Sequence, residues 1–211
     1  MERIAFALKI LPGRIERANE LFAKMAGRVR EDAKAAGIAN FSVWGVEDMV
    51  FAYGEYPDGF SFEGEFGGKC ACWMESLSDC AELFCAPRTM RLMYHDYGIV
   101  REDKGLIRHR VFATKLKPGC EEEYKRRHDG LIEARGDTVS EGPDSNFSIW
   151  HGKGYIFGYC EKVKSFDREM TEEEKASTIA WETRQLEIMD WLTDDVDWIT
   201  GEKHEAIRRI I

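Results

Sequence analysis

The sequence lacks the features that mark several classes of protein. Its 211 residues include only 5 prolines and no low-complexity tract, so we expect an ordered chain except at its ends. No apolar run approaches the ~20 residues that a membrane-spanning helix needs. The net charge of -9 excludes a chain-wide attraction to nucleic acid or to anionic membranes, because both require positive charge. We therefore expect neither a nucleic acid nor a membrane among the partners.

The N-terminus, MERIAFALKILPG, lacks the features of a secretory signal peptide. Its apolar part is short, Lys9 interrupts it, and no small-residue cleavage site follows. We therefore expect a cytoplasmic protein whose six cysteines are reduced. Four of them have the spacing C-x-C-x7-C-x4-C, which could bind zinc but lacks the paired C-x2-C of known zinc modules. Those four, expected to be free and partly buried, are Cys70, Cys72, Cys80 and Cys85.

What the chain does contain is an internal repeat. Three segments of the first half match three segments of the second half, and all three pairs are offset by 106 residues. Trp73 and Trp181 also match if two residues are inserted. Several matches in one register predict two homologous halves, residues 1–105 and 106–211. The paired segments are FALKILPG (6–13) with FATKLKPG (112–119), NFSVW (40–44) with NFSIW (146–150), and FAYGE (51–55) with FGYCE (157–161).

Each half shows the same order of expected elements. An apolar strand, 4–11 or 108–116, leads through Pro-Gly into a helix at about 14–36 or 120–136. Two strands follow, and then a second helix. The order predicts an α+β protein made of two ferredoxin-like β-α-β-β-α repeats. Each repeat would have one bare sheet face, so the two could pack together as an intramolecular α+β barrel.

The second half gives sharper signals for two of these elements. HGKG, residues 151–154, is a good hairpin turn because glycine accepts positive φ. Thr171 and Glu174 have capping-box spacing and predict the start of a helix that extends to Leu192. Its apolar residues recur at helical spacing at Ile179, Leu186, Met189 and Leu192. The tail from Glu202 to Ile211 is expected to form a short docking helix.

The stretch EEEYKRRHDG, residues 121–130, raises the question of function. Tyr124 and His128 stand at i and i+4, so they share one face of the expected helix, and Arg127 lies near that face. The first half has Ala18 and Phe22 at the matching positions while the surrounding scaffold residues remain. The polar pair therefore differs between otherwise similar halves. The structural alternative is that this helix face is buried in the core of the first half and solvated in the second half.

FATKLKPGCEEEYKRRHDGL, residues 112–131, resembles the N-terminal motif of the L-rhamnose mutarotase family. The strands NFSIW and YIFGYCE that follow are also similar to that family. The resemblance implies a small α+β barrel that interconverts the α and β anomers of L-rhamnose or a related deoxysugar without metal or cofactor. It further implies that His128 is the proton-donating histidine and that Tyr124 is the active-site tyrosine.

The resemblance also indicates substrate-binding candidates and two departures. Phe147 falls where the family has a substrate-contacting tyrosine, so one hydroxyl is lost. The family's pair of tryptophans falls at about Ile188 and Met189, so that pair is absent. Other tryptophans could supply a stacking surface, and Arg127 could bind sugar hydroxyls or keep the tyrosine acidic. The substrate-binding candidates are Arg127, Phe147, Trp150, Trp181 and Trp191.

The chemistry of mutarotation suits these residues. Opening a hemiacetal requires one group to protonate the ring oxygen and another to accept the anomeric hydroxyl proton. A histidine can do either, and a nearby tyrosine can relay the proton. We therefore predict a mutarotase for a deoxysugar monosaccharide such as L-rhamnose or L-fucose, acting as a monomeric pseudo-dimer or a homodimer. The first half would complete the barrel with a degenerate site. The alternatives are a non-catalytic sugar-binding or regulatory barrel, and a cofactor-free barrel enzyme of another reaction class.

Overall fold

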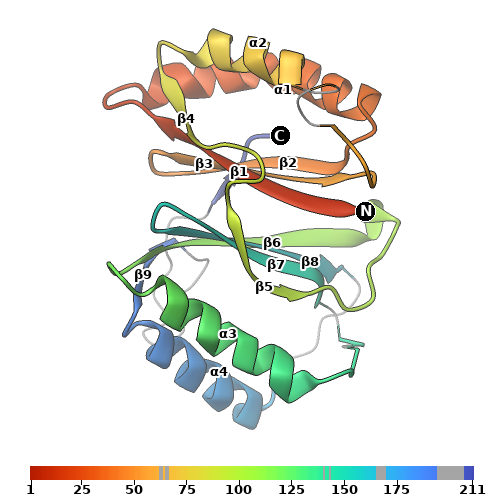
Figure 1. The fold of residues 1–211 in the computed structure, drawn as a ribbon, viewed down its shortest axis with the longest axis vertical. Coiled ribbons are helices and arrows are strands. Elements are labelled where there is room, and N and C mark those ends of the chain that lie inside the picture. The colour runs from red at the N-terminus through yellow and green to blue at the C-terminus, as the bar shows by residue number, and fades with distance from the viewer. Residues whose placement is uncertain (62–63, 65–66, 140, 143, 165–169, 194–206) are drawn as a thin grey trace. The chain divides into compact units, whose positions relative to one another are not determined.

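The computed structural model describes residues 1–61, 64, 67–139, 141–142, 144–164, 170–193 and 207–211. These residues form two five-stranded antiparallel sheets and four α-helices (Figure 1), which confirms the expected α+β class. The chain divides into two compact units: Met1–Met90 with Arg208–Ile211, and Arg91–Ile207. Within the described ranges, every helix is too short or too polar to cross a membrane.

The first unit is a sheet with two helices on one face. Its strands lie in the order β10-β2-β3-β1-β4, and α1 and α2 lie side by side over the sheet (Figure 1). The residues that α1 buries are spaced three or four apart, as an amphipathic helix requires. The elements are β1 (Glu2–Ile10), α1 (Ile15–Ala35), β2 (Ala39–Val46), β3 (Met49–Tyr56), α2 (Gly68–Leu77), β4 (Ala81–Cys85) and β10 (Arg208–Arg209).

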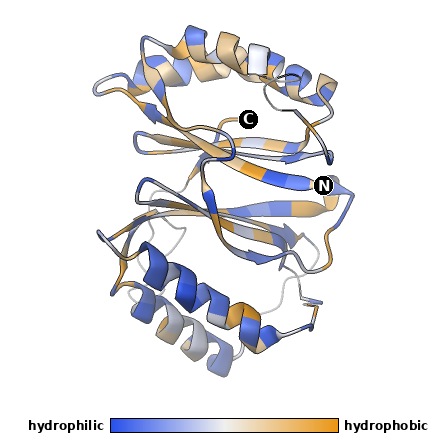
Figure 2. Ribbon diagram, viewed as in Figure 1, coloured by the Kyte–Doolittle hydropathy of each residue, from blue (hydrophilic) through white to orange (hydrophobic). Residues whose placement is uncertain are grey.

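The second unit has the same plan. Its strands lie in the order β5-β7-β8-β6-β9, and α3 and α4 cover one face of the sheet (Figure 1). Figure 2 shows that α3 is mostly hydrophilic; the residues it buries are Tyr124 and His128. The elements are β5 (Arg91–Asp96), the 3-10 turn η2 (Lys104–Leu106), β6 (Ile107–Leu116), α3 (Glu121–Arg135), β7 (Asp144–Gly152), β8 (Tyr155–Val163), α4 (Glu172–Gln185) and β9 (Met189–Thr193).

Four strands of each sheet have the ferredoxin-like arrangement, β2-β3-β1-β4 and β7-β8-β6-β9. Strand register also corresponds at the offset of 106, since Phe6 lies opposite Ala52 and Phe112 lies opposite Gly158. The fifth strand of each sheet comes from a distant part of the sequence. Strand β5 pairs with β7, and β10 pairs with β2. The division at residue 105 and the closure into a barrel stay predictions.

Several local expectations are confirmed. The helices expected at 14–36 and 120–136 are α1 and α3. The Glu174 N–H donates to the Thr171 hydroxyl at 3.2 Å, and the Thr171 N–H donates to the Glu174 carboxylate at 2.8 Å, which is a capping box. In the HGKG turn Lys153 has φ 49° and Gly154 has φ 84°, the two positive values that a tight hairpin turn needs.

Two expectations at the C-terminal end are wrong. The second helix of the second half ends at Gln185 rather than at Leu192, because residues 189–193 form β9 and pair with β6. Sheet pairing thus overrides the helical spacing of the apolar residues there. In the tail, Arg208–Arg209 form a strand that pairs with Trp44 and Gly45 instead of a helix. Residues 202–206 of that expected helix lie outside the described part of the chain.

A buried glutamate organises each sheet. Glu161 is fully buried and accepts hydrogen bonds from Asn146 at 2.9 Å and Tyr159 at 3.0 Å; Lys104 forms an ion pair with it at 2.9 Å. In the first unit Glu55 accepts hydrogen bonds from the equivalent residues, Asn40 at 3.0 Å and Tyr53 at 3.2 Å. Buried charge is tolerated only when it is paired and hydrogen-bonded. These networks explain why the repeated motifs carry Asn and Tyr-x-Glu.

Gly158 provides a test of the packing in the second unit. A Cβ at this position would overlap the ring of Phe112 on the neighbouring strand. We expect Gly158→Ala to lower the free energy of unfolding by about 1–3 kcal/mol, because the aromatic ring must move. Gly130→Ala in α3 is the matched control, since its Cβ would meet no atom within 4 Å and alanine favours a helix by about 1 kcal/mol. Urea unfolding would measure the free energy of unfolding of both variants. Equal values for Gly158→Ala and Gly130→Ala would contradict the close packing of Phe112 on Gly158.

Candidate active site

A pocket of about 210 Å³ lies within the second unit, between the helices α3 and α4 and the sheet. Its lining combines aromatic rings with a few polar groups, the usual composition of a small-molecule site. The volume is below the ~300–1,000 Å³ that holds drug-sized ligands. The lining residues that bear on function are Tyr94, Tyr124, His128, Phe147, Trp181, Glu182, Gln185 and Trp191.

His128 lies on α3 and is buried, with 5% of its surface exposed. Its Nδ1 lies 2.9 Å from the backbone oxygen of Tyr124 one turn earlier. A carbonyl oxygen can only accept, so Nδ1 carries the proton and Nε2 has the free lone pair. Burial lowers the pKa of His128 to about 4, against 6.5 for an ordinary histidine. At neutral pH this side chain is therefore an uncharged base.

Two tyrosines flank the imidazole. The Tyr124 ring stacks on it with 4.2 Å between centroids, and the Tyr94 ring meets it edge-on at 5.5 Å. Burial raises the pKa of Tyr124 well above its usual range and raises that of Tyr94 to about 12. Both phenols therefore stay protonated at neutral pH. They can donate hydrogen bonds to a bound molecule but are not bases.

The remaining aromatic residues form the walls. Trp181 of α4 meets the His128 ring edge-on at 5.4 Å, and Phe147 of β7 meets Tyr94 in the same way at 5.3 Å. Trp191 of β9 packs against Phe112 at 5.7 Å. These rings exclude water from part of the pocket and offer apolar surface to a ligand.

Gln185 is the most unusual polar group in the lining. It is 1% exposed, and neither its amide oxygen nor its amide nitrogen has a hydrogen-bond partner among the described residues. A buried amide left without partners costs free energy, so such a group calls for an explanation in a folded protein. Its position in the lining suggests that a ligand supplies the missing partners.

The structure brings together five of the seven residues expected at the site. Tyr124, His128, Phe147, Trp181 and Trp191 all line the pocket. They come from four elements: Tyr124 and His128 from α3, Phe147 from β7, Trp181 from α4 and Trp191 from β9. These residues are far apart in the sequence, from 124 to 191, but they lie close together because α3 and α4 cover the same face of the sheet.

Arg127 and Trp150 do not line this pocket. The Arg127 guanidinium donates to Glu123 at 2.7 Å and to Glu187 at 2.8 Å, so it ties α3 to the segment after α4. The Trp150 indole donates to the Ser148 hydroxyl at 2.9 Å and is buried in the sheet. Both residues thus have structural contacts, and their expected roles in substrate binding stay predictions.

Tyr94 and Gln185 are among the lining residues that the sequence did not indicate as site residues. Tyr94 lies on β5, which precedes the expected boundary between the halves, so no local pattern connects it to residue 128. Gln185 stands four residues after Trp181 on α4, hence on the same helix face. That spacing was the signal that could have identified it.

The cysteines are free thiols in the described structure. Cys80 and Cys85 are buried and Cys72 is exposed, and burial together with the nearby Asp32 carboxylate raises the pKa of Cys70 to about 12. In the described ranges, no three His, Cys, Asp or Glu side chains are grouped so that they could hold a metal ion.

Comparison with known proteins finds a similarity that includes this pocket. The sequence model of the family "L-rhamnose mutarotase" matches residues 109–209, which include α3, α4 and most of the pocket lining. Residues 109–209, just under half of the chain, are thus similar to the L-rhamnose mutarotase family. Tyr124 and His128 fall inside the matched stretch, whereas Tyr94 precedes it.

Two further comparisons give little more. No curated protein sequence matches the chain significantly. Among solved structures, a crystal structure of a "Putative monooxygenase" from Fusobacterium nucleatum subsp. nucleatum is similar over 89% of this chain and 87% of that chain. The identity is 10% and the TM-score is 0.42.

The buried imidazole predicts a loss of stability in acid. In the unfolded chain His128 titrates near 6.5, and in the folded chain at about 4, so between these values the unfolded state binds the extra proton. Its stabilising contribution is fully present above pH 6.5 and falls as the pH is lowered toward 4. We expect the second unit to lose about 2–3 kcal/mol from this group between pH 7 and pH 4.5.

His128→Phe is the variant that isolates this effect, because Phe22 already fills the corresponding position of the first unit. Urea unfolding at pH 7 and pH 4.5 would compare the acid-induced loss in wild type and variant. The variant should lose about 2–3 kcal/mol less than wild type. Equal losses in both proteins would mean that His128 is not held neutral by burial.

Proposed function

We propose that the second unit catalyses mutarotation of a deoxysugar monosaccharide such as L-rhamnose or L-fucose. The observation that carries the proposal is the state of His128: a buried, neutral imidazole whose Nδ1 is fixed by the Tyr124 carbonyl and whose Nε2 can accept a proton. The similarity of residues 109–209 to the L-rhamnose mutarotase family supports the same reaction.

The geometry supports the following division of roles. Nε2 of His128 takes the proton of the anomeric hydroxyl as the ring opens, which makes it the general base of this step. Rotation about the bond to the exposed carbonyl carbon turns its other face to the ring hydroxyl. On closure the imidazolium returns a proton to the new anomeric oxygen. Proton transfer of this kind contributes roughly 10²–10⁴-fold to a rate.

The ring oxygen needs a proton from another group while the base acts. The hydroxyls of Tyr124 and Tyr94 are the candidates, since both rings contact His128 and both stay protonated. An alkoxide is a stronger base than a phenolate, so one of these phenols gives its proton to the ring oxygen as the ring C–O bond breaks, and on closure the phenolate takes back the proton of the ring hydroxyl. The resemblance implies that His128 is a proton donor; in this proposal it accepts a proton on ring opening and donates one on closure.

Sugar recognition follows from the rest of the lining. Trp181, Trp191 and Phe147 offer apolar faces to the C–H side and the methyl group of a deoxysugar. The Gln185 amide can both donate to and accept from sugar hydroxyls, which would satisfy its buried polar atoms. A volume of about 210 Å³ favours one sugar ring over an oligosaccharide.

The first test is the rate of anomer exchange, measured by saturation-transfer NMR on L-rhamnose, L-fucose and D-glucose. We expect the wild-type protein to accelerate exchange of one deoxysugar and His128→Ala to lower that acceleration by about 10²–10⁴-fold, because the base is removed. The rate constant at low sugar concentration should fall only below about pH 4–5, where the free enzyme's His128 becomes protonated.

His151→Gln is the control, because His151 lies on the β7–β8 hairpin and is not part of the pocket lining. It should retain the wild-type rate. If His128→Ala bound the sugar and the wild type gave no acceleration, the protein would be a sugar-binding module. A lack of both binding and acceleration for every sugar would overturn the proposal.

Gln185→Leu tests the role of the amide in binding. Leucine stands at the corresponding position of the first unit, Leu77, so a similar environment accepts it. We expect sugar affinity to fall about tenfold through lost hydrogen bonds, while the sugar-free protein is equally stable or gains about 1 kcal/mol because a buried unpaired amide is gone. Isothermal titration and urea unfolding would measure these two quantities. Unchanged affinity together with lower stability would show a purely structural glutamine.

A further inference from the structure

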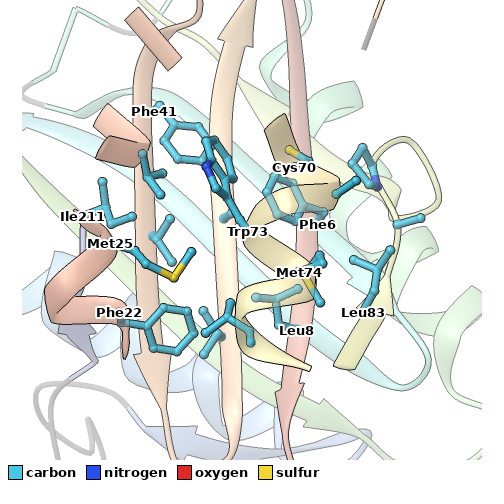
Figure 3. Close-up of a pocket in the computed structure, with 18 of the residues that line it drawn as sticks. Phe6, Leu8, Phe22, Met25, Phe41, Cys70, Trp73, Met74, Leu83 and Ile211 are labelled. Atoms are coloured by element: carbon cyan, nitrogen blue, oxygen red, sulfur yellow. The ribbon is translucent and has the colours of Figure 1, made fainter. Parts of the chain in front are cut away.

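The first unit contains a second, larger cavity to which the proposed mutarotase chemistry assigns no role. It has a volume of about 450 Å³ and lies between the helices α1 and α2 and the sheet (Figure 3). Every residue that lines it belongs to the first unit. The cavity therefore has to be explained from the side chains of that unit alone.

The cavity corresponds in position to the pocket of the second unit. Phe6 and Phe112 are offset by 106 residues, as are Phe41 and Phe147, and each pair contributes to the respective lining. On the second helix Trp73 lines the larger cavity as Trp181 lines the smaller one. The two cavities thus occupy the same layer of the same fold.

The two cavities differ in the polarity of the side chains that line them. The polar groups of the second unit are replaced by apolar ones in the first, and the bulk of one tryptophan is lost, which enlarges the space. The replacements, with the second-unit residue first, are His128 by Phe22, Glu182 by Met74, Gln185 by Leu77 and Trp191 by Leu83.

No charged side chain lines the larger cavity within the described part of the chain. The indole N–H of Trp73, a donor that could have served a ligand, is used by Asp32 at 3.2 Å. Figure 3 shows Phe22, Met25, Phe41 and Met74 near Trp73, and it shows sulfur atoms among the carbon atoms of the lining. A ligand here would meet carbon and sulfur.

The cavity also has a closed interior and an accessible rim. Phe22, Trp73 and Leu77 are 6%, 8% and 3% exposed and form inner walls. At the rim, Leu83 of β4 is 45% exposed and Ala71 of α2 is exposed as well. A molecule entering here would cover the exposed surface of Leu83, one of the large apolar side chains that the unit leaves in solvent.

The physical properties of the space restrict its occupant. Ordered water needs two to four polar partners, which this lining does not offer, and empty apolar volume weakens packing in proportion to its size. A peptide helix, ~10–12 Å across with side chains, is too wide for a cavity of about 450 Å³ between the helices and the sheet. A dry cavity of ~150 Å³ binds benzene, so 450 Å³ suits a molecule of about two rings.

We propose that the first unit binds an uncharged, apolar small molecule of about two rings in the cavity between α1, α2 and the sheet. Met25 and Met74 give the walls the adaptability that such a ligand needs, because an unbranched thioether adjusts its shape at low cost. The chain then carries two sites of opposite character, one for a polar sugar and one for an apolar molecule.

The test uses the full chain labelled with ¹³C at the methionine methyl groups and naphthalene as an uncharged two-ring probe. Met25 and Met74 line the larger cavity, and Met189 lines the smaller one, so each site carries its own reporter. The probe should shift the signals of Met25 and Met74 and leave Met189 unchanged. L-Rhamnose, added separately, should leave Met25 and Met74 unchanged.

Two variants make the result specific. Ala52→Phe fills the cavity from β3, and Ala71→Trp occupies its exposed rim, where folding is not at risk. Each should weaken probe binding at least tenfold and leave anomer exchange unaltered. Glu75→Trp, an exposed position of α2 outside the lining, is the matched control and should bind as wild type does.

The proposal is overturned if the probe leaves Met25 and Met74 unshifted up to its solubility limit. It is equally overturned if the probe shifts Met189 as strongly, or if Ala71→Trp binds as tightly as Glu75→Trp. None of these outcomes bears on whether the second unit accelerates anomer exchange, because that reaction is measured on the NMR signals of the sugar.

Discussion

The packing of two helices over one face of a five-stranded sheet is the constraint on which both cavities depend. The helices are held at a distance set by the largest side chains between the layers, and smaller neighbours leave space beside them. In the second unit that space is smaller and its lining includes several polar groups, whereas in the first it is larger and lined by apolar side chains. The same backbone plan thus yields two kinds of site through the identity of a few inward-facing residues.

Within the second unit, one backbone hydrogen bond determines what the site can do. The Tyr124 carbonyl holds Nδ1 of His128, so the helix that presents the imidazole also selects its tautomer. Surrounding rings then keep it neutral by excluding water. The two effects have the same origin in α3, which buries little else than Tyr124 and His128. A helix so hydrophilic elsewhere is fixed to the unit largely by these two buried residues and by ion pairs such as that of Arg127 with Glu187.

The sequence was most informative where local chemistry decides structure. Proline and glycine turns, the capping box of Thr171 and the helical i, i+4 pair at 124 and 128 all depend on neighbours within a few residues. It was misleading where pairing with distant strands decides: apolar spacing continued past Gln185, yet the chain enters β9 because β6 offers hydrogen bonds. Tyr94 could not be found for the same reason, since only the sheet places β5 beside β7.

The edge strands have a consequence for dissecting the protein. Because β5 precedes the expected boundary at residue 105 yet pairs with β7, a fragment cut at that boundary would leave the second sheet without one edge strand and without Tyr94. An uncovered strand edge is a template for pairing with other chains, so such a fragment would tend to aggregate. Truncation therefore has to follow hydrogen-bonded strands rather than the matching segments of the sequence, and a self-contained second unit begins at Arg91.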